Sequence, residues 1–358
     1  MDAQDAMLIL NPAAGARDVR REVGQVMGFL RQQGWQMQLC ETRGPCDATA
    51  FARQAVATGK GVVLVVGGDG TINEVVNGLA GSEVAVGLLP AGTGNVWAME
   101  MRLPTPGPIR SHKLLDATRS LARGQVRPID LGRANGRYFL LWGGIGLDAQ
   151  VTHRMEPRTR RTKKLGALAY GVTAVLVAKD FRGTRTRVLF DGQTIRTRSM
   201  LIIISNAQLY ARIARIATRA YLDDGLLDVC VFKGSGLAMT LLHVAHVLTE
   251  RHLRDPHVSY VQARQITIET RQPMPVQVDG DPIGTTPVTF EAVPGALRII
   301  VPPEVPPWLF VDGGERPGRF QWDFSWPVGW DLRGRARRLA HRVQDRWRGE
   351  SQPPETGG

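Results

Sequence analysis

A short glycine-rich segment with an acid at its centre is the part of this sequence best suited to chemistry. Residues 67–71 read GGDGT and follow a continuous apolar run at 61–66. The glycines allow backbone N–H groups to approach phosphate oxygens, and a helix expected over 72–79 adds the positive end of its dipole. A carboxylate in such a loop repels phosphate unless it serves a metal or takes a proton, so Asp69 indicates phosphoryl transfer with a divalent cation. The plain alternative is a tight turn from strand to helix that Asp69 caps.

A second loop of the same kind begins at Pro90. Residues 90–95 read PAGTGN, follow the apolar run 84–89 and precede another helical pattern. Loops at the carboxyl ends of neighbouring parallel strands face one crevice, which is the usual ligand site of an open α/β sheet. Thr93 and Asn95 can donate hydrogen bonds to phosphate or ribose oxygens. The pair of loops indicates nucleotide binding more strongly than either loop alone.

The elements that must position these loops alternate between strand and helix patterns. Strands are expected at 7–10, 35–42, 61–66 and 84–89, and helices at 19–30 and 47–58. The run at 61–66 (GVVLVV) suits a central parallel strand that is buried on both faces. This alternation predicts an open α/β nucleotide-binding domain over residues 1–125.

The pattern becomes mainly β from residue 126 onward. Asn135-Gly136 between two apolar runs indicates a hairpin. Short β-like runs follow at 185–190, 200–205, 226–232, 265–270, 274–279, 288–292 and 297–302, with helices expected at 165–178 and 237–248. We therefore expect a β-sandwich or barrel domain over residues 126–302.

Residues 303–358 form a C-terminal extension that holds five of the eight tryptophans and many arginines. From Trp330 onward, apolar residues at helical spacing with arginines on the other faces predict an amphipathic helix, and 351–358 looks disordered. Such a helix suits the headgroup region of an anionic membrane, and packing on the protein is the alternative. The basic run 154–164 is either a solvated loop or a further contact with anionic lipid.

The composition narrows the classes of partner. A net charge of +12 and a pI of about 10.3 favour polyanionic partners without choosing among them. The three cysteines and seven histidines show no zinc-ligand spacing, and the cysteines fit a reducing cytoplasm. No signal peptide is visible, and no apolar run approaches the roughly 20 residues of a spanning helix. Without an RNA-binding aromatic motif or a helix-turn-helix signature, nucleic acid is not expected.

The motifs, taken in order, resemble the diacylglycerol kinase catalytic domain, a family shared by bacterial lipid kinases, sphingosine kinases and ceramide kinases. They are Asn11-Pro12, GGDGTINEVVNGL at 67–79, PAGTGN at 90–95, IDLG at 129–132, GGIGLDAQV at 143–151, SNAQLYA at 205–211, DDGLLDV at 223–229 and VDGD at 278–281. GGDGT alone is also similar to loops of NAD kinases and phosphofructokinases. The PAGTGN partner and the later motifs single out the lipid kinases.

The resemblance implies an ATP-binding domain similar to NAD kinase, followed by a β-sandwich domain, with catalysis between them. It assigns Asp69 to the metal and nucleotide site and Asp130 and Asp281 to the catalytic cleft. It places a structural Mg²⁺ at the DDGLLD segment, with Asp224 as the side-chain ligand and Asp223 as the alternative. The implied nucleotide-binding residues are Asn11, Gly67, Gly68, Gly70, Thr71, Glu74, Gly92, Thr93, Asn95 and Asn206.

Two departures from the family pattern bear on activity. The family usually has glutamate where this chain has Asp281, and the shorter side chain withdraws the carboxylate by ~1.5 Å, a scale on which catalytic placement is sensitive. After SNAQLYA the family usually continues with glycines, whereas this chain continues ARIARIATRA, which puts acceptor entry in doubt.

We therefore expect an ATP- and Mg²⁺-dependent lipid kinase that phosphorylates the hydroxyl of diacylglycerol, a sphingoid base or a related lipid, with Asp69 or Asp130 taking the proton. The expected location is the cytoplasm, with peripheral attachment to an anionic membrane surface. The protein could form a homodimer, but the sequence does not reveal the oligomeric state. The alternatives are a soluble small-molecule kinase of the NAD kinase type and a non-catalytic basic protein that binds membranes.

Overall fold

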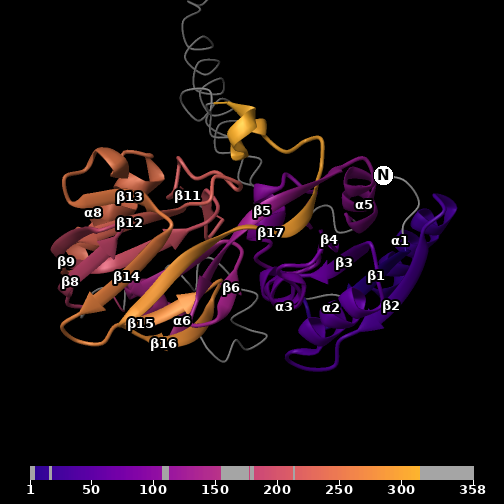
Figure 1. Cartoon of the computed structure of the whole chain (residues 1–358), viewed down its shortest axis with the longest axis horizontal. Helices are drawn as coiled ribbons and strands as arrows, with labels where there is room; N and C mark the ends of the chain where they lie inside the picture. Colours follow the sequence, from indigo (N-terminus) through magenta and orange to yellow (C-terminus); the bar gives the residue numbers. More distant parts are fainter. Residues whose placement is uncertain are drawn as a thin grey trace, which may run out of the picture. The chain divides into compact units, whose positions relative to one another are not determined.

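The computed structural model describes residues 5–15, 18–106, 113–154, 177, 181–212 and 214–314, which belong to one compact unit (Figure 1). In the first part of this unit, the strands are β1 (Asp5–Leu10), β2 (Gln36–Glu41), β3 (Val62–Gly67) and β4 (Ala85–Pro90). The helices are α1 (Arg20–Gln32), α2 (Asp47–Ala57), α3 (Asp69–Leu79), α4 (Val96–Glu100) and α5 (Leu114–Ala122), the last of which the sequence patterns did not reveal.

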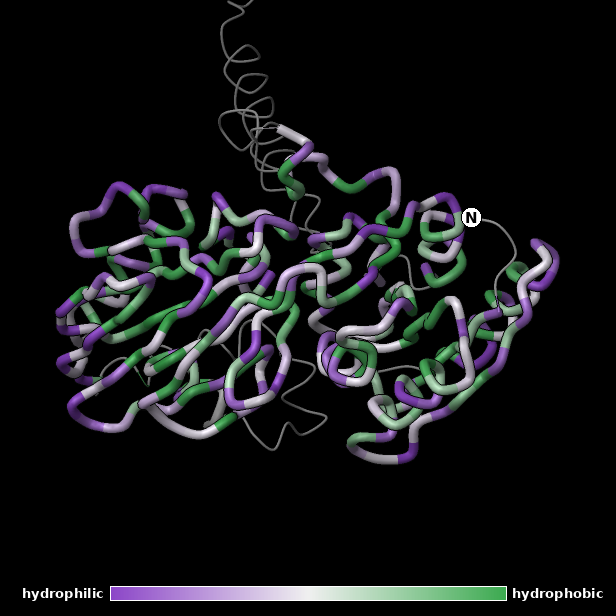
Figure 2. The backbone as a smooth tube through the Cα atoms, in the orientation of Figure 1, coloured by the Kyte–Doolittle hydropathy of each residue, from purple (hydrophilic) through white to green (hydrophobic). Residues whose placement is uncertain are grey.

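These four strands form a parallel sheet in the order β4-β3-β1-β2. β3 and β4 are buried along their whole length, and their apolar residues follow the centre of this part in Figure 2. A parallel strand covered by helices on both faces needs such a continuous apolar run, and the expected open α/β fold is confirmed. α3 begins at Asp69, earlier than the expected start at residue 72, because Gly68 already occupies the position before the first helical residue.

The second part is mainly β. Its strands are β5 (Gln125–Ala134), β6 (Arg137–Phe139), β7 (Trp142–Gly146), β8 (Thr184–Phe190), β9 (Gln193–Ser205), β10 (Leu209–Tyr210), β11 (Ala214–Arg215), β12 (Leu227–Lys233), β13 (Val258–Ala263), β14 (Gln265–Thr270), β15 (Pro275–Val278), β16 (Asp281–Thr285) and β17 (Val288–Val301). The helices are α6 (Leu147–Arg154), which was not expected, and α8 (Gly236–Leu248), which was; short 3₁₀ turns lie at His252–Arg254, Pro307–Leu309 and Val311–Gly313.

One long strand joins the two parts. β17 pairs antiparallel with β5 and β14, and its far end pairs parallel with β4 at Arg298 opposite Ala85. The separate strands expected at 288–292 and 297–302 are therefore one strand, with an irregularity between Val293 and Leu297. The sheet passes without a break from the α/β part into the β part through this pairing.

Apolar residues on the inward faces of the strands hold the β part together. One buried cluster gathers side chains from β7, β8, β9, β12, β14, β15 and β17, and a second lies under α6 and α8. The predicted hairpin between β5 and β6 is confirmed, because Asn135 and Gly136 both have positive φ angles (49° and 76°), as a tight two-residue turn requires. The expectation of a β-sandwich is confirmed.

The C-terminal extension begins by packing on this unit. Leu309 and Phe310 are buried, and the carbonyl of Leu309 accepts a hydrogen bond from the N–H of Leu222 (2.8 Å). The helix expected at 165–178, apart from Val177, lies outside the described residues, as do the helix expected from residue 330 and the basic run beyond residue 154. Among the helices that the structure describes, none is both long and apolar enough to cross a membrane.

Candidate active site

The two glycine-rich loops lie side by side because the strands that carry them are neighbours. Gly67 at the end of β3 lies opposite Pro90 at the end of β4. A Cβ atom on Gly68 would lie 3.1 Å from the Cα of Gly92, and one on Gly92 would lie 2.6 Å from the Cα of Gly68. Glycine is therefore required at position 92, and a side chain at position 68 would crowd the same backbone contact. The two loops therefore lie together at one edge of the sheet, as the sequence predicts.

Asp69 is the first residue of α3 and joins the two loops. Its Oδ1 accepts a hydrogen bond from the backbone N–H of Trp97 (3.2 Å), near the start of α4. Burial raises the pKa of the Asp69 carboxyl, while the N–H groups of Val96 and Trp97 and the charge of Arg212 oppose that rise. The carboxylate thus has a structural partner of its own in the neighbouring loop.

The end of β1 contributes to the same edge of the sheet. Asn11 follows β1, and its Nδ2 donates a hydrogen bond to Oγ1 of Thr71 (2.9 Å) in the first turn of α3. Its Oδ1 accepts a hydrogen bond from the N–H of Ala13 (3.0 Å). In the PAGTGN loop, the carbonyl of Thr93 accepts a hydrogen bond from the guanidinium of Arg212 (2.5 Å). Three strand ends therefore bring predicted nucleotide-binding residues together.

Two buried side-chain amides have an oxygen without a donor. Nδ2 of Asn95 donates to the carbonyl of Gly92 (2.7 Å), and Nδ2 of Asn206 donates to the carbonyls of Asp130 (2.9 Å) and Leu140 (3.0 Å). Within the described residues, Oδ1 of both amides is buried and unpaired. A buried acceptor without a donor is costly, so these oxygens fit a ligand that brings N–H or O–H groups. The hydroxyls and amino group of a nucleotide have that chemistry.

α3 connects the glycine loop to the β part through one of its faces. Asp69, Asn73 and Asn77 are spaced four residues apart and share that face. Nδ2 of Asn73 donates to Oδ2 of Asp279 (2.7 Å), and the side chain of Asn77 exchanges two hydrogen bonds with the backbone of Tyr138 (2.9 Å each). The first two turns of α3 thus link the phosphate-type loop to the turn before β16.

Asp279 organises that turn, and the sequence analysis did not single it out. Its carboxylate accepts hydrogen bonds from the N–H groups of Leu140 (2.7 Å), Leu141 (2.9 Å) and Trp142 (3.0 Å), besides the one from Asn73. Burial raises the pKa of Asp279 to about 6 against the effect of these donors. Its φ of 48° is left-handed, which aspartate tolerates better than most residues. The only local indication of this turn in the sequence is the segment Asp279-Gly280-Asp281, which is typical of turns.

Asp281 begins β16 and forms an ion pair with Arg137, whose Nη2 also donates to Oδ1 of Asn73 (3.2 Å). The side chains of Asp281 and Arg137 are 42% and 37% exposed, so the pair is open to an incoming molecule. Glu74 lies on the next position of α3. Burial raises the pKa of its carboxyl, the charge of Asp281 adds to the rise, and N–H groups around the start of α2 oppose it.

Asp130 lies in a different group of acids. Its carboxylate accepts hydrogen bonds from the N–H groups of Gly225 (2.5 Å) and Gly295 (2.8 Å). Burial raises the pKa of Asp130, and the charge of Asp223 contributes to the rise. The structure therefore gathers Asp130 with the DDGLLD segment.

The two acids of that segment have different partners. Asp223 pairs with Arg127 (3.4 Å) and accepts a hydrogen bond from the N–H of Val311 (2.8 Å). Asp224 accepts a hydrogen bond from the N–H of Leu226 (3.0 Å), and burial with the charges of Asp130 and Asp223 raises its pKa to about 6. Across the described ranges, no three acidic, histidine or cysteine side chains are grouped to hold a metal ion. A cation here fits Asp224 as its one carboxylate, completed by other oxygen atoms.

Comparison with known proteins agrees with this geometry. Residues 5–134 match the family model of the diacylglycerol kinase catalytic domain, and residues 144–301 match that of the YegS C-terminal NAD kinase beta sandwich-like domain. The diacylglycerol kinase of Bacillus subtilis is 28% identical over 84% of this chain and 97% of its own length. The diacylglycerol kinase of Staphylococcus carnosus is 26% identical over 84% and 96%.

A solved structure of a diacylglycerol kinase from Bacillus anthracis is similar to the fold, with a TM-score of 0.69 and 25% identity, over 84% of this chain and 98% of that one. The two family models follow each other along the chain in the order of its two parts. The chain therefore belongs to the diacylglycerol kinase catalytic-domain family, a family of lipid kinases.

Proposed function

We propose that this lipid kinase transfers the γ-phosphoryl group of ATP to the hydroxyl of diacylglycerol or of a related lipid such as a sphingoid base. The observation that carries the proposal is the position of α3. The helix starts at the glycine loop with Asp69 and, one turn later, contacts Asp279 and Arg137 through Asn73. Four residues of helix rise about 6 Å, so the two groups of side chains are close enough to act on neighbouring reactants.

In the proposed reaction, the lipid hydroxyl oxygen attacks the γ-phosphorus of ATP as the bond to the β–γ bridging oxygen breaks and ADP leaves. The hydroxyl proton passes to a carboxylate. Asp281 is our choice, because it is half-exposed and Arg137 holds its orientation. Asp69 is the alternative base, whereas both oxygens of Asp130 already accept backbone hydrogen bonds.

The nucleotide would lie along the two glycine-rich loops. The unpaired oxygens of Asn95 and Asn206 would accept its donors, and Asn11 with Thr71 would complete the phosphate end. When bound, Mg²⁺ would neutralise charge on the transferring phosphoryl group. Asp69 is the carboxylate that we assign to it, since burial of that acid without a cation is unfavourable. A second, structural Mg²⁺ at Asp224 stays part of the proposal.

A lipid kinase must meet a substrate that is dissolved in a membrane. The excess of positive charge supports attachment to an anionic membrane surface in the cytoplasm. Attachment from one side needs no spanning helix, and peripheral association is therefore the mode that we propose.

The test is incubation of the full chain with labelled ATP and a total lipid extract, followed by identification of the labelled product. A parallel reaction with NAD tests the soluble kinase alternative. Asp69→Asn is expected to lower kcat on the order of 100-fold. Asp116→Asn, an exposed acid paired with Arg119, is the matched control. Labelling of NAD alone, or a tenth of wild-type activity retained in Asp69→Asn, would contradict the proposal.

A further inference from the structure

α8 presents an apolar face to solvent. Its sequence, GLAMTLLHVAHVL, contains no acidic residue, lysine or arginine. Four of its large side chains, between 36% and 52% exposed, are Leu241, Leu242, Val244 and Leu248. They make up half of the eight large apolar side chains that are exposed in the part of the chain that the structure describes. A solvated helix normally turns such a stripe inward, and exposed apolar patches mark contact sites.

The inward side of α8 carries both polar and apolar side chains. The two buried side chains of α8 are Thr240 and His243. The hydroxyl of Thr240 donates to the carbonyl of Gly236 (3.0 Å), and Nε2 of His243 lies 2.9 Å from the carbonyl oxygen of Lys233. The ring of His243 also packs edge-on against Phe232, with centroids 5.2 Å apart. The inward face of α8 also includes Leu237, Met239 and Val247, which pack against the second buried cluster, so the exposed leucines lie on the opposite side.

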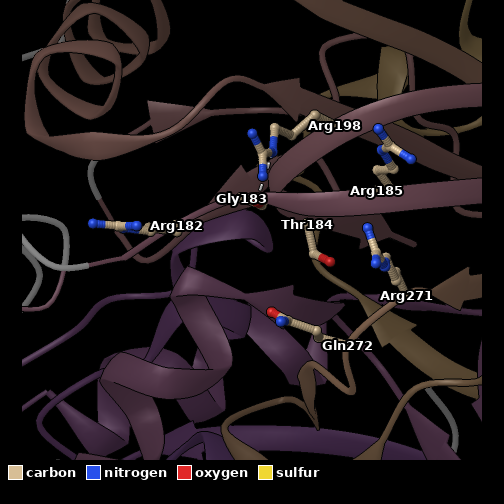
Figure 3. Close-up of a pocket in the computed structure, with 7 residues that line it drawn as sticks. All are labelled: Arg182, Gly183, Thr184, Arg185, Arg198, Arg271 and Gln272. Carbon is tan, nitrogen blue, oxygen red and sulfur yellow. Dashed lines mark hydrogen bonds between the residues drawn. The ribbon is translucent and has the colours of Figure 1, made fainter.

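An arginine cluster lies on three adjacent chain segments of the β part. Arg185 on β8 lies opposite Arg198 on β9, and the N–H of Arg271 donates to the carbonyl of Arg185 (2.9 Å). With Arg182 and their neighbours, these residues line a pocket of about 480 Å³ (Figure 3). Like charges directly opposite each other on neighbouring strands are destabilising. Such a row therefore favours an anion between its members.

The next row along the same strands shows the contrast. There Arg187 lies opposite Arg196, and Glu269 on β14 pairs with Arg187 (3.0 Å). Within the described ranges, no carboxylate forms an ion pair with any of the four arginines that line the pocket. Arg198 donates instead to the carbonyl of Gly183 (2.9 Å), the contact drawn as a dashed line in Figure 3. The pocket thus lacks the internal counter-charge that its neighbour has.

The apolar face and the arginine cluster border each other. The N–H of Gly236, the first residue of α8, donates to the carbonyl of Phe181 (3.2 Å), next to Arg182. Just before the helix, the N–H of Gly234 donates to the carbonyl of Arg198 (3.1 Å). The start of α8 is therefore attached to the backbone segments that carry Arg182 and Arg198.

We propose that α8 and the arginines of this pocket dock the enzyme on an anionic lipid bilayer. The leucines of α8 enter the boundary between headgroups and acyl chains, and the guanidinium groups bind lipid phosphates. The inference deepens the proposed function by naming the surface that meets the membrane, and it requires no catalytic step. Charge complementarity selects this occupant, because the surface combines apolar side chains with four arginines that form no ion pair among the residues that the structure describes.

The experiment is co-sedimentation of the full chain with vesicles that contain no diacylglycerol, in the absence of ATP. Vesicles of phosphatidylcholine alone are compared with vesicles that also contain phosphatidylglycerol, whose negative surface potential attracts basic residues. The first variant is Leu241→Ser/Leu242→Ser, with Leu39→Ser/Val56→Ser as a control that removes equally exposed apolar residues elsewhere. The second is Arg185→Gln/Arg271→Gln, with Arg20→Gln/Arg119→Gln removing the same charge at acid-paired positions.

The leucine variant should bind both kinds of vesicle at least about tenfold more weakly than the wild type, since membrane binding scales with buried apolar area. The arginine variant should lose about 30-fold in affinity for the anionic vesicles at low salt, from two basic residues, and little for the neutral ones. Both control variants should bind as the wild type does. All variants should keep the wild-type melting temperature and their activity on a short-chain lipid in detergent micelles.

Wild-type binding by both folded test variants overturns the proposal. So does a change of mass by light scattering in the leucine variant with vesicle binding intact, because α8 would then contact a second copy of the chain. Loss of binding in the arginine control to the same extent would mean that net charge alone acts. An inactive wild-type enzyme that still binds vesicles through α8 would refute the proposed activity and leave the docking surface standing.

Discussion

Replacing Asn73 with aspartate would place a second carboxylate against Asp279. In the native protein, Nδ2 of Asn73 donates to Oδ2 of Asp279 at 2.7 Å, and Asn73 is almost fully buried. The substitution keeps the shape of the side chain and removes this donor. Two carboxylates at that separation cannot both ionise without strong repulsion, so the pair should retain one proton.

The size of the effect follows from the geometry. Two charges with centres about 4 Å apart interact by about 4 kcal/mol at an effective dielectric constant of 20, which is about 3 pKa units. The pKa of Asp279 is about 6 in the native protein, so the pair should keep its proton to about pH 9. A raised folded-state pKa of an acid stabilises the fold at low pH, and that contribution is lost as the pH rises. Between pH 5 and pH 8 the variant should therefore lose about 3 kcal/mol more stability than the wild type, which itself loses about 1 kcal/mol over the same range.

Urea unfolding followed by tryptophan fluorescence at pH 5 and pH 8 measures this difference. The double variant Asn73→Asp/Asp279→Asn exchanges the two groups, so one carboxylate again faces one amide. It should show no extra loss at pH 8, whatever its stability at pH 5. A single variant that is destabilised equally at both pH values would refute the reasoning, because the damage would then come from packing and not from charge.

Three further outcomes are expected. Asp281→Glu should keep or raise activity on a lipid acceptor, because the longer side chain restores the family's usual reach. Asp281→Asn should lose most of the activity, and an active Asn variant would mean that Asp281 is a turn residue only. Thermal melts of the wild type without ATP should rise with Mg²⁺ and those of Asp224→Ala should not; a wild type indifferent to Mg²⁺ would remove the structural ion. Because the pKa of Asp279 is raised from 3.8 to about 6, the wild type should lose up to about 3 kcal/mol of stability from pH 4 to pH 7. Asp279→Asn should flatten this dependence of stability on pH, and an unchanged dependence would contradict the role given to Asp279.

Local patterns were enough to predict the nucleotide-binding edge. The buried strands β3 and β4 were visible as continuous apolar runs, and the loops after them followed because parallel neighbours end at one edge. The turn at Asn135-Gly136 could also be predicted, because its conformation depends on two adjacent residues. Each of these predictions needed only residues that are near each other in the chain.

Contacts between distant residues could not be predicted in this way. Asn73 and Asp279 are separated by 206 positions, and only the folded sheet brings them together. The pairing of β17 with β4 likewise depends on a strand that passes from one part of the fold into the other. α8 was predicted as a helix, but its composition is apolar on nearly every side, so no periodicity indicated which face would be exposed.

The carboxylate of Asp69 has a structural contact that its motif did not predict. A carboxylate in a phosphate loop looked unfavourable without a metal or a proton, yet this one also accepts the N–H of Trp97 and ties the two loops together. Asp69→Asn can keep that hydrogen bond through its remaining oxygen, whereas Asp69→Ala removes both the charge and the acceptor. If the charge serves catalysis, both variants should be inactive and only the alanine variant should melt earlier, by a few degrees for about 1 kcal/mol. If the asparagine variant melts as early as the alanine variant, its loss of activity would reflect a displaced loop, and Asp69 would have to be reassigned from catalysis to architecture.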